Sequence, residues 1–206
     1  MNSLLIALIS WCAVSAGVAS TFVRYRRVAV QGVEGVSTAT WLLFTLNGGF
    51  WIAYGLFGAH SAVIVVSSLL CWPLQGVITF RLAPWRHRRG SSQALALFAA
   101  TCVAPGLVGG WTWCVYGCGV SMVVLRTPQL RQLLLARDAS GVSATSWYFS
   151  AGCAALWIIY YAQVDLVAAL VATLISGVVS LSIALLATAR HRQGARDFVR
   201  LEVFAN

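Results

Sequence analysis

Apolar residues fall into seven long stretches along the chain: 3–23, 38–57, 61–80, 93–109, 112–134, 143–163 and 166–188. Each stretch approaches the roughly 20 apolar residues that a helix needs to cross the hydrocarbon core of a bilayer. We therefore expect seven transmembrane helices, because a helix satisfies its own backbone hydrogen bonds in lipid. The first stretch has no basic residue before it, which favours a span over a signal peptide.

The polar connections between these stretches alternate in charge. Three connections and the tail hold arginine, whereas the other three hold His60, Gly109-Gly110 and Asp165. The clusters are Arg24, Arg26 and Arg27; Arg81, Arg86, Arg88 and Arg89; Arg131 and Arg137; and Arg190, Arg192, Arg196 and Arg200. Arginine gathers in cytoplasmic loops, and only an odd number of spans puts every cluster on one side. The pattern predicts a multi-pass protein of the cell membrane, with its N-terminus outside and its C-terminus cytoplasmic. Arg126 lies slightly deeper, and we expect its long side chain to reach the same face.

Composition supports the membrane reading and narrows the possible partners. The chain is 60% hydrophobic and 9% charged, whereas an average soluble domain has about 25% charged residues. The net charge of +9 comes from arginines clustered between apolar stretches, so we expect a lipid bilayer as partner and no nucleic acid. Cys114 and Cys118 lie one helical turn apart without histidine or carboxylate beside them, so we expect no metal and no cofactor. No paired carboxylates or serine–histidine arrangement lies in the stretches, so we expect no enzyme.

The chain also repeats itself at a spacing of 106 residues. At this shift Gly35-Val36-Ser37 falls on Gly141-Val142-Ser143, and the aromatic residues Trp41, Trp51 and Tyr54 fall on Trp147, Trp157 and Tyr160. The repeat covers the first three and the last three stretches, and the fourth restores their orientation, which makes the repeats parallel. We therefore expect an all-α membrane protein of two three-helix bundles joined by a linker helix (3+1+3). Its predicted parts are 1–85, the first repeat; 86–111, a cytoplasmic loop and the linker helix; 112–190, the second repeat; and 191–206, a cytoplasmic tail.

The Pro128-Gln129 pair, followed by Arg131, Gly141-Val142-Ser143 and Trp157-Ile158-Ile159-Tyr160, resembles the PQ-loop and SWEET transporter superfamily. The first repeat carries the corresponding Trp51-Ile52-Ala53-Tyr54-Gly55, so the resemblance covers both repeats. It implies that Trp51 and Trp157 lie in a sugar pocket and that Pro128 and Gln129 form a hinge. It also implies a hydrogen-bonding residue sixteen positions after each tryptophan. The family has asparagine there, and this chain has Ser67 and Thr173, which offer fewer hydrogen bonds than an amide.

The residues themselves support a pocket without the resemblance. Trp51 and Trp157 lie well inside their stretches, away from the interfaces where aromatic belts form. The belt role suits the other four tryptophans considered: Trp41, Trp111, Trp113 and Trp147. A deep tryptophan either offers a flat face to a solute or packs between helices. Asn47 lies one helical turn before Trp51 on the same face, where its amide either binds the solute or bridges two helices.

We expect no Asp, Glu, Lys or Arg side chain deep in any stretch. Transporters that are coupled to ions or protons usually keep such a residue at depth, so its absence favours passive uniport of a small neutral solute, such as a sugar or polyol, by alternating access. One alternative is a PQ-loop exporter of amino acids or other metabolites. Another is a non-transporting seven-helix receptor for peptides, whose cavity holds basic residues, whereas the arginines here are expected at the periphery. The sequence leaves open whether the chain forms a homo-oligomer.

Overall fold

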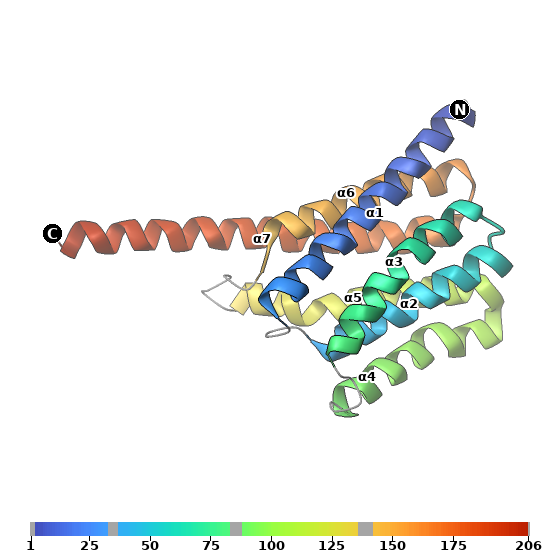
Figure 1. Ribbon diagram of the computed structural model, residues 1–206, viewed down its shortest axis with the longest axis horizontal. Coiled ribbons are helices and arrows are strands. Elements are labelled where there is room, and N and C mark those ends of the chain that lie inside the picture. The colour runs from blue at the N-terminus through green and yellow to red at the C-terminus, as the bar shows by residue number, and fades with distance from the viewer. Residues whose placement is uncertain (1–2, 33–36, 83–87, 136–141, 206) are drawn as a thin grey trace.

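The computed structural model describes residues 3–32, 37–82, 88–135 and 142–205, and every regular element within these ranges is a helix. The elements are α1 (Ser3–Gln31), α2 (Thr38–Phe57), α3 (Ala62–Arg81), α4 (Arg88–Phe98), the π-helix η1 (Ala99–Val103), α5 (Ala104–Leu135), α6 (Ala144–Gln163) and α7 (Val167–Ala205). The helices lie roughly along one common direction, and α7 continues well beyond the others (Figure 1).

Four helical stretches are long and apolar enough to cross a membrane, which makes this a membrane protein by length and composition: Leu4–Val30, Ala62–Arg81, Arg88–Thr127 and Val167–Gln193. The helices α2 and α6 are each 20 residues long but fall outside this set. Both carry several tryptophan and tyrosine side chains, whose polar atoms lower the hydropathy of an otherwise apolar helix.

The stretch Arg88–Thr127 contains a reversal of the chain. A straight helix of 40 residues would be about 60 Å long, twice the roughly 30 Å of the hydrocarbon core. Gly110 interrupts it with φ 67° and ψ −157°, a conformation that glycine adopts without steric cost. From that turn α4 with η1 and α5 run in opposite directions (Figure 1). The predicted break between 93–109 and 112–134 therefore lies at this glycine.

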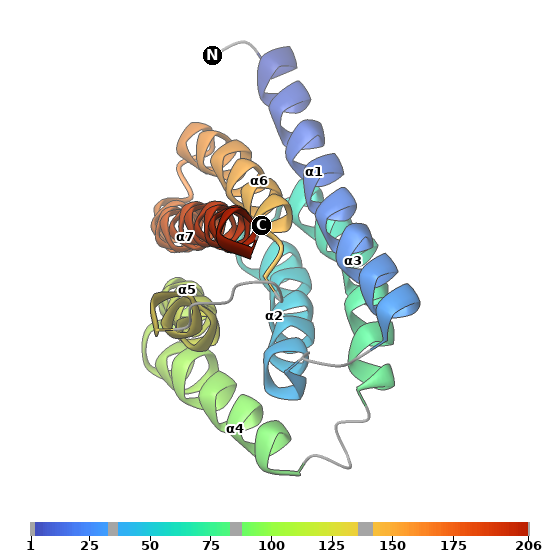
Figure 2. The ribbon, with the colours of Figure 1, turned by 90° about the vertical axis from the view of Figure 1, so that its left-hand side faces the viewer.

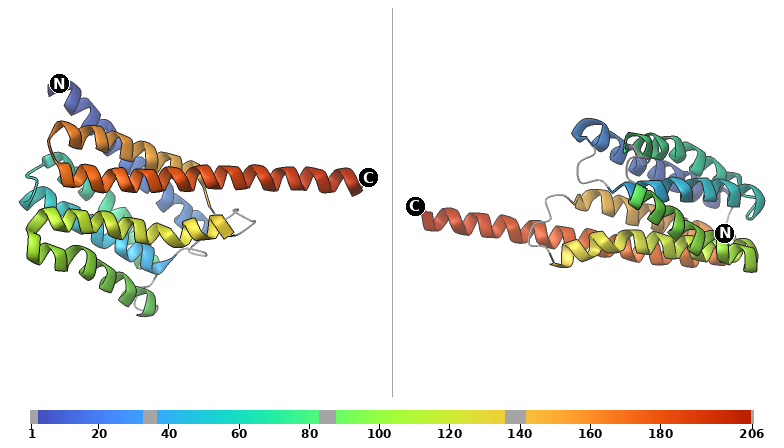
Figure 3. Two further views of the ribbon diagram at one scale, coloured as in Figure 1. Left: turned by 180° about the vertical axis from the view of Figure 1, so that it is seen from behind. Right: turned by 90° about the horizontal axis from the view of Figure 1, so that it is seen from below.

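The helices pack in two similar sets. In the first, α3 contacts both α1 and α2; in the second, α7 contacts both α5 and α6. The sets meet chiefly where α1 packs against α6, while α4 lies at the outside against α2 (Figure 2). The C-terminal ends of α1, α3 and α5 lie at the same end of the molecule, the end from which α7 projects (Figures 1 and 3).

Two serines at repeat-related positions begin equivalent helices. The Ser37 hydroxyl accepts a hydrogen bond from the backbone N–H of Thr40 at 3.3 Å and caps α2. The Ser143 hydroxyl accepts one from the N–H of Ser146 at 3.4 Å and caps α6. Serine is a favoured N-cap because its oxygen satisfies an otherwise free donor. The other members of the repeated tripeptide, residues 35, 36 and 141, lie outside the described residues.

Two helices extend beyond their apolar stretches. The first helix continues to Gln31, beyond the expected end at 23, and α7 continues to Ala205, beyond 188. Arg190 on this extension donates hydrogen bonds to the carbonyls of Leu133 at 3.1 Å and Leu134 at 2.9 Å. Those carbonyls belong to the last turn of α5, where carbonyl groups have no N–H donor within their own helix. The apolar pattern thus indicates only the apolar portion of each helix, and the helix continues beyond it. The predicted boundary at 85 and 86 lies outside the described residues.

Candidate functional site

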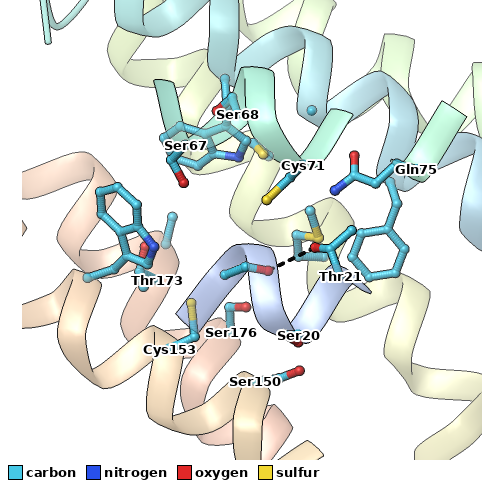
Figure 4. A pocket seen from close by; sticks show the side chains of 18 of the residues that line it. Ser20, Thr21, Ser67, Ser68, Cys71, Gln75, Ser150, Cys153, Thr173 and Ser176 are labelled. Carbon is cyan, nitrogen blue, oxygen red and sulfur yellow. Dashed lines mark hydrogen bonds between the residues drawn. The ribbon is translucent and has the colours of Figure 1, made fainter. Parts of the chain in front are cut away.

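A cavity of about 260 Å³ lies between the two sets of helices. Its described lining comes from α1, α2, α3, α5, α6 and α7, and none of it from α4 or η1. Polar side chains from four of these helices surround the space (Figure 4): Ser20, Thr21, Ser67, Ser68, Cys71, Gln75, Ser150, Cys153, Thr173 and Ser176. The cavity therefore offers many short hydrogen-bonding groups from several directions.

Both predicted tryptophans line this cavity, with a third ring between them. Tyr161 stacks on Trp51 at a centroid distance of 6.4 Å and an interplanar angle of 14°, and on Trp157 at 5.3 Å and 25°. The tyrosine is buried at 5% exposure. The two indoles therefore do not close directly on each other: they enclose Tyr161, and the stack Trp51–Tyr161–Trp157 forms one wall of the cavity. The repeat comparison missed Tyr161, because Gly55 stands 106 residues before it.

Ser67 and Thr173 line the same cavity from α3 and α7, at repeat-related positions. Ser67 is buried, and Thr173 is partly exposed to the cavity. Among the described residues, no hydrogen bond joins either hydroxyl to another group, although several other helical serines in this chain bond to a carbonyl one turn earlier. The two hydroxyls are therefore available to a solute.

Asn47 does not line the cavity. Its side chain is fully buried, and Nδ2 donates to the Ser121 hydroxyl at 3.1 Å. Its Oδ1 lies 3.4 Å from the thiol of Cys118 and 3.9 Å from that of Cys102. The amide thus connects α2 with α5 and η1, which favours the bridging role over the solute-binding role that the sequence left open.

Arg126 lines the cavity, which corrects the expectation that every arginine lies at the periphery. Its side chain is only 8% exposed, and Nη1 donates to Ser176, to the carbonyl at 2.8 Å and the hydroxyl at 2.5 Å. Its Nε is buried without a hydrogen-bond partner among the described groups. The position of Arg126 near the polar end of the stretch 112–134 predicts a side chain at the membrane surface. Its actual direction depends on α7, which no local pattern shows.

Arg24 also lines the cavity, and it donates a hydrogen bond to the hydroxyl of Ser150 on α6. Its guanidinium lies 5.9 Å from the ring centroid of Trp147, and that of Arg126 lies 5.6 Å from the same indole. Trp147 and its repeat partner Trp41 are buried at 8% and 9% exposure, so their expected role in an interfacial belt is wrong. Aromatic faces attract cations, and Trp147 brings two of them together.

Within the described residues no carboxylate pairs with Arg24 or Arg126. The chain holds five acidic residues. Of these, only Asp165 has a described side chain, and it lies in the connection between α6 and α7, away from the helix end that carries Trp147. Glu34 and Asp138 lie outside the described residues. The two cations thus meet hydroxyls, carbonyls and aromatic faces in the part of the chain that is described.

The predicted hinge lies within α5, where the backbone of residues 128 and 129 is helical. The side chains of Pro128 and Gln129 lie outside the described part, so the hinge stays a prediction. A further proline, Pro73, lies inside α3, where the apolar pattern gives no sign of it, and removes one backbone donor from that helix. Beside it, Trp72 Nε1 donates to the carbonyl of Thr45 at 2.9 Å and holds α3 to α2.

No group of three or more histidine, cysteine, aspartate or glutamate side chains gathers anywhere in the described ranges. Comparison of the chain with protein-family models, with curated proteins and with solved structures gives no match.

Proposed function

We propose that this chain is a membrane transporter that moves a small hydroxylated solute by alternating access. The observation that supports this most directly is the cavity of about 260 Å³ between six helices, lined by hydroxyls and closed on one side by an aromatic stack. Sugar-like solutes have apolar ring faces and many hydroxyls, and this lining offers a partner to both. The membrane class of the chain and the cavity between two sets of helices fit a carrier that opens to either side in turn.

The proposed architecture is the 3+1+3 arrangement of the PQ-loop and SWEET superfamily. Three facts support it: α3 lies between α1 and α2, α7 lies between α5 and α6, and the described cavity lining omits α4 and η1. The capping serines Ser37 and Ser143 support the same repeat. In this arrangement α4 with η1 is the linker helix, and the cavity lies on the axis that relates the two bundles.

The proposed orientation places the N-terminus outside and the C-terminus in the cytoplasm. The arginine-bearing ends of α1, α3 and α5 gather at the end from which α7 projects, and positive charge marks the cytoplasmic side. In this orientation Arg24 and Arg126 lie toward the cytoplasmic end of the cavity, because both face Trp147 in the first turn of α6.

The solute need not be neutral. A neutral solute was expected because no charged side chain was expected inside the membrane span. Arg24 and Arg126 line the cavity, so this reason no longer holds. Passive transport remains the proposal, because arginine keeps its proton at physiological pH and so does not shuttle one.

Uptake of a panel of radiolabelled sugars, polyols and their acids into proteoliposomes tests this function. We expect saturable uptake that stops at equal concentrations for a neutral solute, or at electrochemical equilibrium for an acid. Protein-free liposomes should lack this uptake. Uptake that does not saturate, or is equal in protein-free liposomes, contradicts a transporter.

A non-transporting receptor is the second candidate, favoured by the buried arginine in the cavity. It differs from the first in one measurable respect: a receptor binds its ligand in detergent solution but gives no exchange of labelled for unlabelled ligand across a vesicle membrane.

A further inference from the structure

We propose that Arg24 and Arg126 form an anion-binding subsite of the cavity, and that the solute is a small hydroxylated carboxylate, such as a sugar acid. This inference rests on the proposed transport function and names its substrate class. The two guanidiniums come from α1 and α5, line the same cavity, and lie over the same indole of Trp147 at 5.9 and 5.6 Å. Two positive charges in one cavity, with no carboxylate beside them in the described part of the chain, favour the binding of an anion.

The hydrogen bonding of Arg126 leaves one of its donors without an acceptor. Its Nη1 is occupied by Ser176, but its Nε has no partner in the described part of the chain although the side chain is more than nine-tenths buried. A buried charged donor without an acceptor is costly. A carboxylate is the fitting acceptor, because its two oxygens match the planar guanidinium and such bonds are about twice as strong as neutral ones.

A second unpaired group in the same cavity points to hydroxyls on the solute. Gln75 lines the cavity, and its Oε1 is buried near Gly48 of α2 without a hydrogen-bond partner among the described groups. An amide presents an oxygen acceptor and two N–H donors, and rotation about its last bond exchanges them, so it fits a hydroxyl that both donates and accepts. Ser67 on α3 and Thr173 on α7 add free hydroxyls from both bundles. Chloride would satisfy the arginines but would leave Gln75 and these hydroxyls without a partner.

The shape of the cavity fits a solute of sugar size. A volume of about 260 Å³ exceeds that of a few water molecules at roughly 30 Å³ each. The arginines lie beside Trp147 and the stack includes Trp157. These two residues of α6 are ten positions apart, or about 15 Å along the helix. A carboxylate bound at the arginines therefore directs the hydroxylated body of the solute along the cavity toward the stack.

Calorimetric titration of the purified chain in detergent with sodium gluconate and with glucose tests the proposal. Arg126→Gln and Arg24→Gln remove each charge. Arg131→Gln on α5 and Arg26→Gln on α1 are matched controls, because both side chains are exposed on the same helices. Arg126→Lys keeps the charge but not the planar fork, and inorganic phosphate and chloride serve as competitors. A thermal melt of each variant checks its folding.

We expect gluconate to bind more tightly than glucose, and each cavity variant to weaken gluconate binding about tenfold or more. We expect an intermediate loss in Arg126→Lys, no change in the controls, and little change for glucose. Phosphate that competes better than gluconate shows that the subsite takes phosphates and overturns the carboxylate assignment. Equal binding of gluconate and glucose, unchanged by Arg126→Gln and Arg24→Gln in folded protein, overturns the subsite altogether.

Binding and flux measurements distinguish a failure of the anion subsite from a failure of the proposed transport function. Gluconate binding without flux in proteoliposomes contradicts the transporter and leaves the anion subsite in place. Saturable glucose flux without gluconate binding contradicts the anion subsite and leaves the transporter in place.

Discussion

At the scale of single residues, the stack of Trp51, Tyr161 and Trp157 forms one wall of the cavity in which we propose that the solute binds. Tyr161 stacks on the two indoles at 6.4 and 5.3 Å, so a solute that uses the covered face of either indole must displace the tyrosine ring. Stacked pairs contribute about 0.5–1.5 kcal/mol beyond area burial, which is small enough for the rings to separate during a transport cycle.

We therefore predict that Trp51→Ala and Trp157→Ala each reduce solute flux about tenfold or more, because each removes one face of the stack and its contact with the solute. Flux per folded protein in proteoliposomes measures this. Trp113→Ala is the control, since Trp113 is 59% exposed and does not line the cavity. If the cavity variants instead fail to insert or fold, the rings serve packing rather than transport.

Ser67→Ala and Thr173→Ala should have milder effects. Each removes one neutral hydrogen bond to the solute, and such a bond contributes about 0.5–1.5 kcal/mol net. We expect a several-fold rise in the half-saturating concentration, with the maximal rate little changed. Ser182→Ala on α7 is a suitable control, because its hydroxyl bonds to the carbonyl of Val178 at 2.9 Å and lies outside the cavity. An equal effect of the control contradicts the assignment.

The sequence was informative about these residues for a definite reason. Trp51 and Ser67 lie on helices joined by a short turn, so their spacing puts them at similar depth, and the repeat applies the same argument to Trp157 and Thr173. The directions of the Arg24 and Arg126 side chains do not follow from such spacing, because the direction of a long side chain near the end of a span depends on its neighbours. Ser176 on α7 and Ser150 on α6 hold these guanidiniums, and both partners are distant in sequence.

At the scale of elements, the π-helix η1 packs closely against α5. Pro105 follows η1 and has no N–H to donate to the carbonyl of Thr101 four residues earlier. The widened turn of η1 places this carbonyl against Gly117 on α5, where a β-carbon would overlap the Thr101 oxygen. The glycine is therefore required by the approach of two backbones, which the apolar pattern does not reveal.

We predict that Gly117→Ala destabilises the protein by about 1–3 kcal/mol, the usual cost of forced overpacking. Gly152→Ala on α6 is the matched control, since nothing lies within 4 Å of a β-carbon there. In that open helical position alanine should stabilise by about 0.5–1 kcal/mol. Thermal melting in detergent compares the two, and an equally stable Gly117→Ala protein contradicts the close packing of η1 on α5.

The bounds of the helices show what hydropathy can and cannot predict. The structure places α2 at Thr38–Phe57 and α3 at Ala62–Arg81, within a residue of the expected ranges, because a capping serine and a short turn end each apolar stretch abruptly. The bounds of α1 and α7 were missed, since arginine and glutamine are good helix formers and continue a helix beyond the apolar part. The widened turn of η1 was missed because it changes hydrogen bonding without changing composition.

At the scale of the whole molecule, the alternating helices predict opposite sides for their two sets of ends. Cysteines introduced at His60 and at Arg88, both exposed, should react with a membrane-impermeant maleimide from opposite sides of intact cells. We expect His60→Cys to react from outside and Arg88→Cys only after the membrane is opened. The unmodified protein, with its six cysteines, gives the background. Reaction of both from the same side contradicts seven spans.

Transport should also be independent of protons. The described cavity lining contains no histidine, aspartate, glutamate or lysine, and these are the groups whose charge pumps and carriers commonly change. We expect equal initial rates between about pH 6 and 8, and no accumulation of solute above equilibrium when a pH gradient is imposed on proteoliposomes. Concentration driven by the pH gradient contradicts passive transport.

The two arginines that line the cavity carry fixed positive charge into the span of the protein. Moving one elementary charge through the full field of a membrane changes its energy by about 2.3 kcal/mol per 100 mV. An empty carrier with two such cations and a carrier neutralised in part by a carboxylate therefore respond differently to the membrane potential. An interior-negative potential holds the empty arginines toward the cytoplasm and pushes the anionic solute outward. Turnover should generate a current, and the interior-negative potential should favour export of the acid from the cell.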